Sequence, residues 1–337
     1  MSSTTFPELR CGGLLDNSPS AMSQLTNDIS SALWKGDVAT VARLLEGQCA
    51  DELMVHPNVP LLVHACGVPQ LPPGCLNTII QHARDVNITD YLGQNGLMCA
   101  AGYGLSKNAR CMLAAGAKID ARDNQGRTAL HYAVLVLEPN PGLIQLLMDA
   151  GASVAATNHT GETPLHLAMR DGHPAVVQKL LEHQAPVNAV TKQGRTPLHY
   201  AAESRKADAS QSLLAKGALV DATDVAGWTP LLVAIAAWRY PAAQVLLAHG
   251  ANATARLKPD THTFGPASAL QLALGEFDGW LRDERDPRRE FDRHFFEALV
   301  GAGADLQVRT PNGKTLAHLA YNNAAALEYF LEKGVAD

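Results

Sequence analysis

The chain has 337 residues and a formal net charge of −6, which argues against a surface built to bind nucleic-acid phosphates. Hydrophobic residues make up 47% of the sequence but aromatic residues only 5%, so we expect a core of Ala, Leu and Val between thin stacked helices. No apolar run approaches the roughly 18 residues that a membrane-spanning helix needs. The sequence therefore predicts neither a nucleic-acid partner nor a membrane partner.

The first residues differ in character from the rest of the chain. Residues 1–17 contain Ser, Thr, Gly and Pro without periodicity and lack the apolar core of a signal peptide, so we expect a disordered tail. Ser18-Pro19 predicts the N-cap and first-turn proline of a helix that runs towards Trp34. After Gly36-Asp37 a second helix is expected over 41–45.

An eight-residue pattern, Gly161-Glu-Thr-Pro-Leu-His-Leu-Ala168, organises the middle of the chain. Thr163 suits a helix N-cap, and Pro164 suits the first helical position, where its missing N–H is no loss. A break at 171–174 precedes a second helix in which Val177, Leu180 and Leu181 recur at helical spacing. The pattern therefore predicts two short helices joined by a turn.

Related copies of this pattern recur along the chain. They begin at Gly126, Gly194 and Gly227, and a degraded copy begins at Gly313. The residues that follow the Leu-Leu pairs of successive copies, Gln184, Gly217 and Gly250, are 33 positions apart. Extending this alignment over the chain predicts nine units.

The motif and its period resemble the ankyrin repeat, whose hallmark is Thr-Pro-Leu-His-x-Ala every 33 residues. With weaker copies the resemblance covers about residues 28–337. It implies an all-α solenoid of about nine helix-turn-helix repeats joined by short β-hairpins. We expect one repeat domain over 18–337, with divergent repeats in 18–89, clear repeats in 90–255, a repeat with insertions in 256–309 and a C-terminal capping repeat in 310–337.

The four motif histidines are His131, His166, His199 and His318. A catalytic histidine would occur once, beside its own partners, so recurrence argues for a structural role. The resemblance implies that each is a hydrogen-bonding brace between neighbouring repeats.

The remaining residues show no pattern of a metal site or a catalytic site. Cys66 and Cys75 lie near His64 and His82, but the tight cysteine knuckle of a structural zinc site is missing, so we expect reduced thiols and no metal. There is no nucleophile elbow, phosphate-binding loop or H-E-x-x-H motif. We therefore expect no enzyme activity and no cofactor.

Repeat positions that face the concave groove in this family are the candidate contacts with a partner. Trp228 is either a binding hot spot there or packs on the neighbouring hairpin. The other candidates in the groove are Tyr91, Gln94, Tyr103, Asn124, Arg127, His159, Glu162, Arg170, Asp171, Lys192, Arg195 and Glu203.

Two insertions supply further candidates, because insertions in a repeat stack often carry function. The extended hairpin 256–266 brings Arg256, Lys258, His262 and Phe264, and the insertion 275–290 brings Trp280 as an anchor. The neighbouring segment 282–293 has five Arg and five acids, so it predicts an internally paired helix extension rather than a phosphate site.

The leading functional hypothesis is a non-catalytic, monomeric, cytoplasmic module that binds a protein partner through its groove and hairpin tips. More specific alternatives are a bacterial inhibitor or immunity-type protein that neutralises an enzyme or toxin, and a secreted effector translocated into a host cell. A remote alternative is an enzyme with a site hidden in the insertions. Fold alone does not distinguish these roles.

Overall fold

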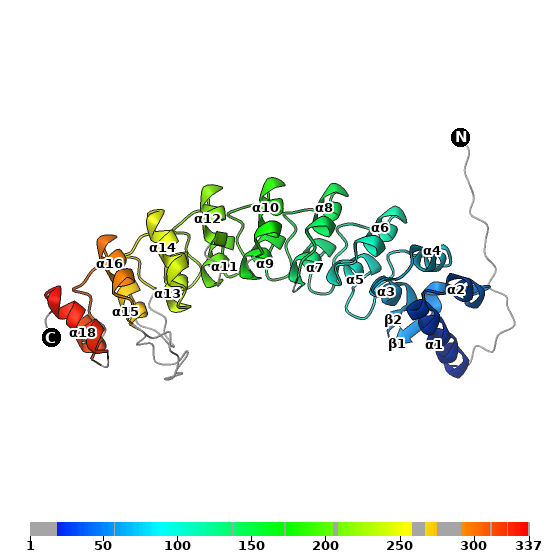
Figure 1. Ribbon diagram of the computed structural model, residues 1–337, viewed down its shortest axis with the longest axis horizontal. Coiled ribbons are helices and arrows are strands. Elements are labelled where there is room, and N and C mark those ends of the chain that lie inside the picture. The colour runs from blue at the N-terminus through cyan, green and yellow to red at the C-terminus, as the bar shows by residue number, and fades with distance from the viewer. Residues whose placement is uncertain are drawn as a thin grey trace. The chain divides into compact units, whose positions relative to one another are not determined.

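The computed structural model describes residues 19–56, 58–136, 138–171, 173–204, 208–257, 267–274, 291–310, 312–321 and 323–335 (Figure 1). The predicted tail 1–17 and most of the two insertions, 258–266 and 275–290, lie outside these residues. The chain divides into two compact units, unit 1 up to His159 and unit 2 from Thr160.

Unit 1 is built from helix pairs and one small hairpin. Figure 1 shows α3, α5 and α7 along one side of this unit and α4, α6 and α8 along the other. The antiparallel strands β1 and β2 precede α3. The elements are α1 (Pro19–Lys35), α2 (Val38–Leu45), a 3-10 helix (Ala50–Glu52), β1 (Met54–His56), β2 (Val59–Pro60), α3 (Leu61–Cys66), α4 (Pro73–Gln81), α5 (Gly96–Gly102), α6 (Ser106–Ala114), α7 (Ala129–Leu135) and α8 (Pro141–Asp149).

Unit 2 repeats the same arrangement, with α9, α11 and α13 in a row that packs helix against helix (Figure 1). The second helices of these pairs, α10, α12 and α14, also contact one another in order. The elements are α9 (Pro164–Asp171), α10 (Pro174–Glu182), α11 (Pro197–Glu203), α12 (Asp208–Ala215), α13 (Pro230–Ala236), α14 (Tyr240–Ala248), α15 (Ala269–Ala273), α16 (Arg293–Gly301), α17 (Leu316–Leu319) and α18 (Ala324–Glu332).

Local sequence sets where the first helix of each pair begins. The predicted proline starts are confirmed: α9 begins at Pro164, α11 at Pro197 and α13 at Pro230. Thr229 caps α13 by accepting a hydrogen bond from the Leu232 N–H. Each such cap satisfies a helix N–H that would otherwise have no partner.

The prediction of an all-α stack of helix pairs is confirmed. Its core is mainly Leu, Ala and Val, as expected from composition. The end of unit 2 differs, because Phe295, Phe296, Tyr329 and Phe330 are fully or almost fully buried there. Tyr240 stacks on Phe295 with ring centroids 4.3 Å apart, so a cluster of aromatic rings fills the core under the last helices.

The loops between repeats are hairpin-shaped but contain little strand. Within the described residues, β1 and β2 form the one sheet, and isolated β-bridges join Thr89 to Asn95 and Arg256 to Ser268. The other hairpins are held by turn hydrogen bonds, and these loops carry most of the candidate site.

Candidate functional site

Several hairpins are closed by one polar side chain at the base. In the hairpin before α13, Asp224 Oδ1 accepts hydrogen bonds from the N–H groups of Ala226 and Trp228, both at 2.9 Å. The Asp224 N–H donates in turn to the Trp228 carbonyl at 3.0 Å. Asp123 does the same in the hairpin before α7, with the N–H groups of Gln125 and Arg127. These bonds fix the conformation from which the tip side chains project.

Successive hairpins are joined tip to tip by backbone hydrogen bonds. In unit 2, Lys192 N–H donates to Thr160 O and Val225 N–H to Gln193 O, both at 2.9 Å. Unit 1 has the same ladder, for example from His159 N–H to Gln125 O at 2.8 Å. Within each unit the tips are thus held in register with one another.

The predicted role of the motif histidines as braces is confirmed for His166 and His199. His166 Nδ1 accepts the Thr163 N–H at 3.1 Å, so the ring proton lies on Nε2, which donates to Arg195 O in the next repeat. His199 bonds Trp228 O in the same way at 3.0 Å. Burial lowers the pKa of His166 to about 4 and also lowers the pKa of His199, so both rings are neutral at pH 7.

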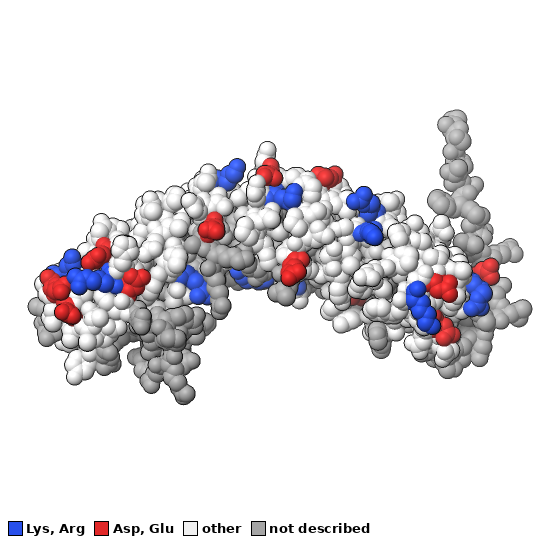
Figure 2. All heavy atoms as spheres, viewed as in Figure 1, with Lys and Arg blue, Asp and Glu red and all other residues white. Residues whose placement is uncertain are grey.

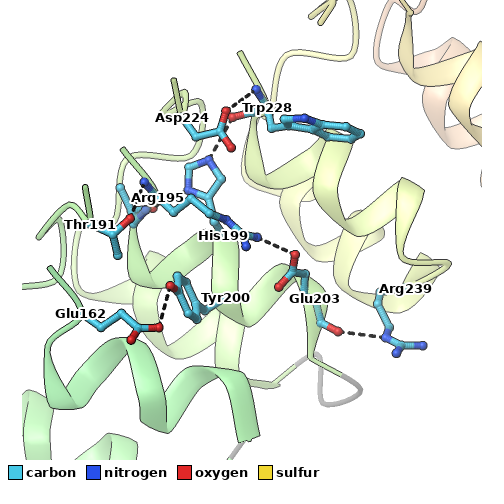
Figure 3. A network of polar contacts seen from close by, with 10 residues as sticks. Glu162, Thr191, Arg195, His199, Tyr200, Glu203, Asp224, Trp228 and Arg239 are labelled. Atoms are coloured by element: carbon cyan, nitrogen blue, oxygen red, sulfur yellow. Dashed lines mark hydrogen bonds and ion pairs between the residues drawn. The ribbon is translucent and has the colours of Figure 1, made fainter. Parts of the chain in front are cut away.

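A polar network crosses three consecutive repeats of unit 2 (Figure 3). The Tyr200 hydroxyl donates to Glu162 Oε1 at 2.9 Å, from α11 back to the hairpin before α9. Arg195 Nη2 lies 2.6 Å from Glu203 Oε1, and its guanidinium lies 5.0 Å from the centre of the Tyr200 ring. Arg239 Nε donates to the Glu203 carbonyl at 3.0 Å.

Unit 1 contains a related but shorter contact. Tyr132 occupies the same motif position as Tyr200 and donates to Asp123 Oδ2, while Gln94 Nε2 donates to the Tyr132 hydroxyl at 2.9 Å. Burial and the Asp123 carboxylate raise the pKa of Tyr132 to about 12. Burial, followed by Glu162, raises the pKa of Tyr200 as well. Both phenols therefore stay protonated at neutral pH and act as hydrogen-bond donors.

The candidate residues of unit 1 fall into two groups. Tyr91 and Tyr103 are well exposed, at 61% and 65%, and His159 is exposed on its hairpin tip. Arg127 is half-buried. Gln94 is tied to Tyr132 and Asn124 donates to Tyr91 O, so these two candidates have structural partners.

The candidate residues of unit 2 divide in the same way. Glu162 and Arg195 are half-buried in the network, whereas Arg170 and Lys192 are exposed. Trp228 is half-buried, and Figure 3 shows its indole extending out from the hairpin. Arg256 does not simply project from its hairpin, because its Nη2 lies 3.3 Å from Asp305 Oδ2.

Some predicted contacts fall outside the described residues. These are Lys258, His262, Phe264, Trp280 and the side chain of Asp171. They stay predictions.

We define the hairpin face of unit 2 as the surface formed by the hairpins before α9, α11 and α13 and by the residues at or just after the C-terminal ends of α9, α11 and α13. Its residues are Glu162, Arg170, Lys192, Arg195, Glu203, Trp228 and Arg239. Sequence reasoning missed Tyr132, Tyr200 and Arg239. The signal for the tyrosines was available: each follows the motif histidine and lies 38 residues after a polar hairpin residue, Gln94 or Glu162.

Charge is not segregated on the face drawn in Figure 2, where basic and acidic side chains are intermixed. A mixed group lies over the C-terminal helices. Among these helices, Arg293 of α16 bridges Glu297 at 3.2 Å and Glu332 of α18 at 2.7 Å. Such locally compensated charge suits recognition of a specific protein surface better than general attraction to a polyanion.

The cysteines have the character of core residues. Burial raises the pKa of Cys66, Cys75 and Cys99, the last to about 12, so the thiols are protonated and poorly nucleophilic at neutral pH. Within the part of the chain that the structure describes, no group of His, Cys, Asp and Glu residues could hold a metal ion. In that same part, none of the helices is long and apolar enough to cross a membrane.

Comparison with known families agrees with the helix pairs, caps and braces. A family model described as ankyrin repeats in three copies matches residues 32–140 and 135–224, which together are more than half of the chain. The search of curated proteins finds no match. The number of repeats, nine, stays a prediction.

Proposed function

Because the chain belongs to the ankyrin repeat family, whose repeats generally mediate contacts between proteins, we propose that it is a non-catalytic protein-binding module. The surface that we assign to the partner is the hairpin face of unit 2. Tyr91 and Tyr103 of unit 1 are the next candidates, since exposed tyrosines are frequent hot spots.

The observation that carries this proposal is the polar network of Figure 3. Arg195 is fixed between Glu203 and the Tyr200 ring, and Arg239 is anchored on the Glu203 carbonyl. Side chains that are ordered before binding lose less conformational entropy when a partner docks. Trp228 and the exposed Lys192 belong to neighbouring hairpins that are joined by the hydrogen bond from the Val225 N–H to Gln193 O.

The test compares two double variants in affinity purification from lysate of the native cell, followed by mass spectrometry. The face variant is Trp228→Ala with Arg170→Glu. The matched control is Trp34→Ala with Lys216→Glu, which makes the same kinds of change at exposed residues that are not part of the hairpin face. Thermal melts establish that both variants are folded.

We expect wild type and the control to retain a partner that the face variant loses. Equal recovery by the face variant would contradict the assignment of this surface. The identity of the partner also decides between the more specific roles. An enzyme or toxin held in a one-to-one complex favours the inhibitor, whereas translocation that depends on residues 1–27 favours the effector.

A further inference from the structure

The hairpin face of unit 2 differs in charge from the chain as a whole. The chain has a net charge of −6, yet this face has four cations, Arg170, Lys192, Arg195 and Arg239. The carboxylates near them are Glu162, Glu203 and Asp224. With Asp171, which follows Arg170 in the sequence, cations and carboxylates are equal in number, so the face lacks the net negative charge of the chain.

Three of these carboxylates already accept hydrogen bonds from within unit 2. Glu162 receives the hydroxyls of Tyr200 at 2.9 Å and Thr160 at 2.8 Å. Glu203 receives Arg195 at 2.6 Å. Asp224 receives two backbone N–H groups of its own hairpin. These bonds already use part of the acceptor capacity of each carboxylate.

Two hydrogen-bond donors of the face, in contrast, have no partner within the described residues. The Lys192 ammonium is exposed, and within the described residues it forms no ion pair. The indole N–H of Trp228 likewise has no hydrogen-bond partner among those residues. Ammonium and indole N–H groups donate and cannot accept, so the side chains left open on this face call for acceptors from the partner.

From this imbalance we propose that the hairpin face of unit 2 binds an acidic polypeptide segment. An Asp or Glu carboxylate of the segment pairs with Lys192, and an apolar side chain beside it packs on the Trp228 indole. Arg195 and Arg239 add positive charge behind this contact. The inference rests on the proposed function and specifies the chemistry of its partner.

The test selects binders to the full-length chain from a displayed library of random 12-residue peptides. We expect the retained peptides to be enriched in Asp and Glu relative to the unselected library. The best peptide, labelled with fluorescein, is then titrated against wild type and variants by fluorescence anisotropy. Its affinity should fall as NaCl is raised, because exposed charge pairs are screened by salt.

Three variants and one control make the assignment specific. Lys192→Glu should weaken peptide binding by about tenfold or more, and Lys192→Gln should weaken it less, because it removes attraction without adding repulsion. Trp228→Ala should also weaken it. Lys216→Glu makes the same charge change on an exposed residue just after α12 and should leave the affinity within about twofold, the usual scale for a charge outside an interface.

The outcomes separate the two levels of the proposal. Peptides without acidic enrichment, or acidic peptides that bind Lys192→Glu as well as wild type, overturn the inference and leave the protein-binding function standing. A labelled single-stranded RNA that binds this face more tightly than the selected peptides also overturns it. If no peptide is retained and wild type recovers no partner from lysate, the proposed function itself fails.

Discussion

His166 in α9 donates its Nε2 proton to the backbone carbonyl of Arg195 across 3.1 Å, which ties one repeat to the hairpin of the next. The same ring accepts the Thr163 N–H at Nδ1, so one neutral imidazole both caps its own helix and braces its neighbour. Protonating Nδ1 would place a donor against the Thr163 N–H. The double role therefore requires the neutral ring.

This relationship predicts a loss of stability in acid. The unfolded chain binds a proton at His166 below about pH 6.5, whereas in the folded chain burial lowers the pKa to about 4. The stability that the neutral His166 ring contributes to folding is complete above pH 6.5 and is lost as the pH falls from 6.5 towards 4. At about 1.4 kcal/mol per pH unit, moving from pH 7 to pH 5 should cost about 2 kcal/mol from His166 alone.

Urea unfolding of wild type and His166→Gln at pH 7 and pH 5 measures this contribution. Gln is a fair replacement because Gln271 occupies the equivalent third position of α15, where its Oε1 accepts the N–H of the N-cap residue Ser268. The variant should lose less stability than wild type between the two pH values. The control His294→Gln removes an exposed histidine and should keep the wild-type slope. An unchanged slope in His166→Gln would contradict the brace.

Close approach between hairpins predicts different costs for two glycines with the same backbone angle. Gly161 and Gly217 both have φ of +84°. A Cβ added to Gly161 would lie 2.9 Å from the backbone nitrogen of Lys192, whereas a Cβ added to Gly217 would meet nothing within 4 Å. Gly217→Ala should lower the free energy of unfolding by about 1–2 kcal/mol, because alanine is unfavourable in the left-handed backbone conformation. Gly161→Ala should cost about 1–3 kcal/mol more, since the hairpins must separate. Equal costs in urea unfolding would contradict this account.

The hydrogen bond between Tyr200 and Glu162 should contribute measurably to stability. Tyr200 is only 8% exposed, and its hydroxyl donates to a half-buried carboxylate. Tyr200→Phe removes this charge-assisted bond and should lower the free energy of unfolding by about 1–2 kcal/mol. Tyr321→Phe is the control, because Tyr321 is 79% exposed and its change should stay within about 0.5 kcal/mol. An unchanged free energy of unfolding in Tyr200→Phe would contradict this prediction and would mean that solvent replaces the lost donor at no cost.

One glutamine occupies a position that suits glycine, and replacing it should stabilise the chain. Gln184 has φ of +59° at the end of α10, where the equivalent residues Gly151 and Gly217 have φ of +91° and +84°. Gln184→Gly should raise the free energy of unfolding by about 0.5–1 kcal/mol, because the left-handed conformation costs glycine little. Gln193→Gly, at an exposed position without positive φ, should be neutral or destabilising. A destabilised Gln184→Gly variant would contradict the argument.

The helix starts were predictable from the sequence because the chemistry that sets them is local. A threonine cap followed by proline places the start of α9, α11 and α13 within two residues. The break after the second helix was less certain in the first repeat. There the positive φ lies at Gly47, whereas alignment on the Leu-Leu pairs points to Gln48, which is three residues after Leu45 as Gln184 is after Leu181.

The contacts of the candidate site were harder to predict because they join residues that are distant in sequence. Glu162 and Arg195 were expected in the groove, but not that Tyr200 would bind the first and Glu203 the second. Arg239 was missed because its role depends on reaching the carbonyl of a residue 36 positions earlier. Such pairs depend on how neighbouring repeats stack, which local patterns do not specify.

The tip-to-tip ladder also limits how this protein can change its specificity. The N–H groups of Lys192 and Val225 and the carbonyls of Thr160 and Gln193 are already engaged with neighbouring hairpins. A ligand strand that tried to extend the stack at these positions would find no open main-chain group. Side chains are left as the variable part, so substitutions at Lys192 or Val225 can redirect binding one position at a time while the main chain stays as it is.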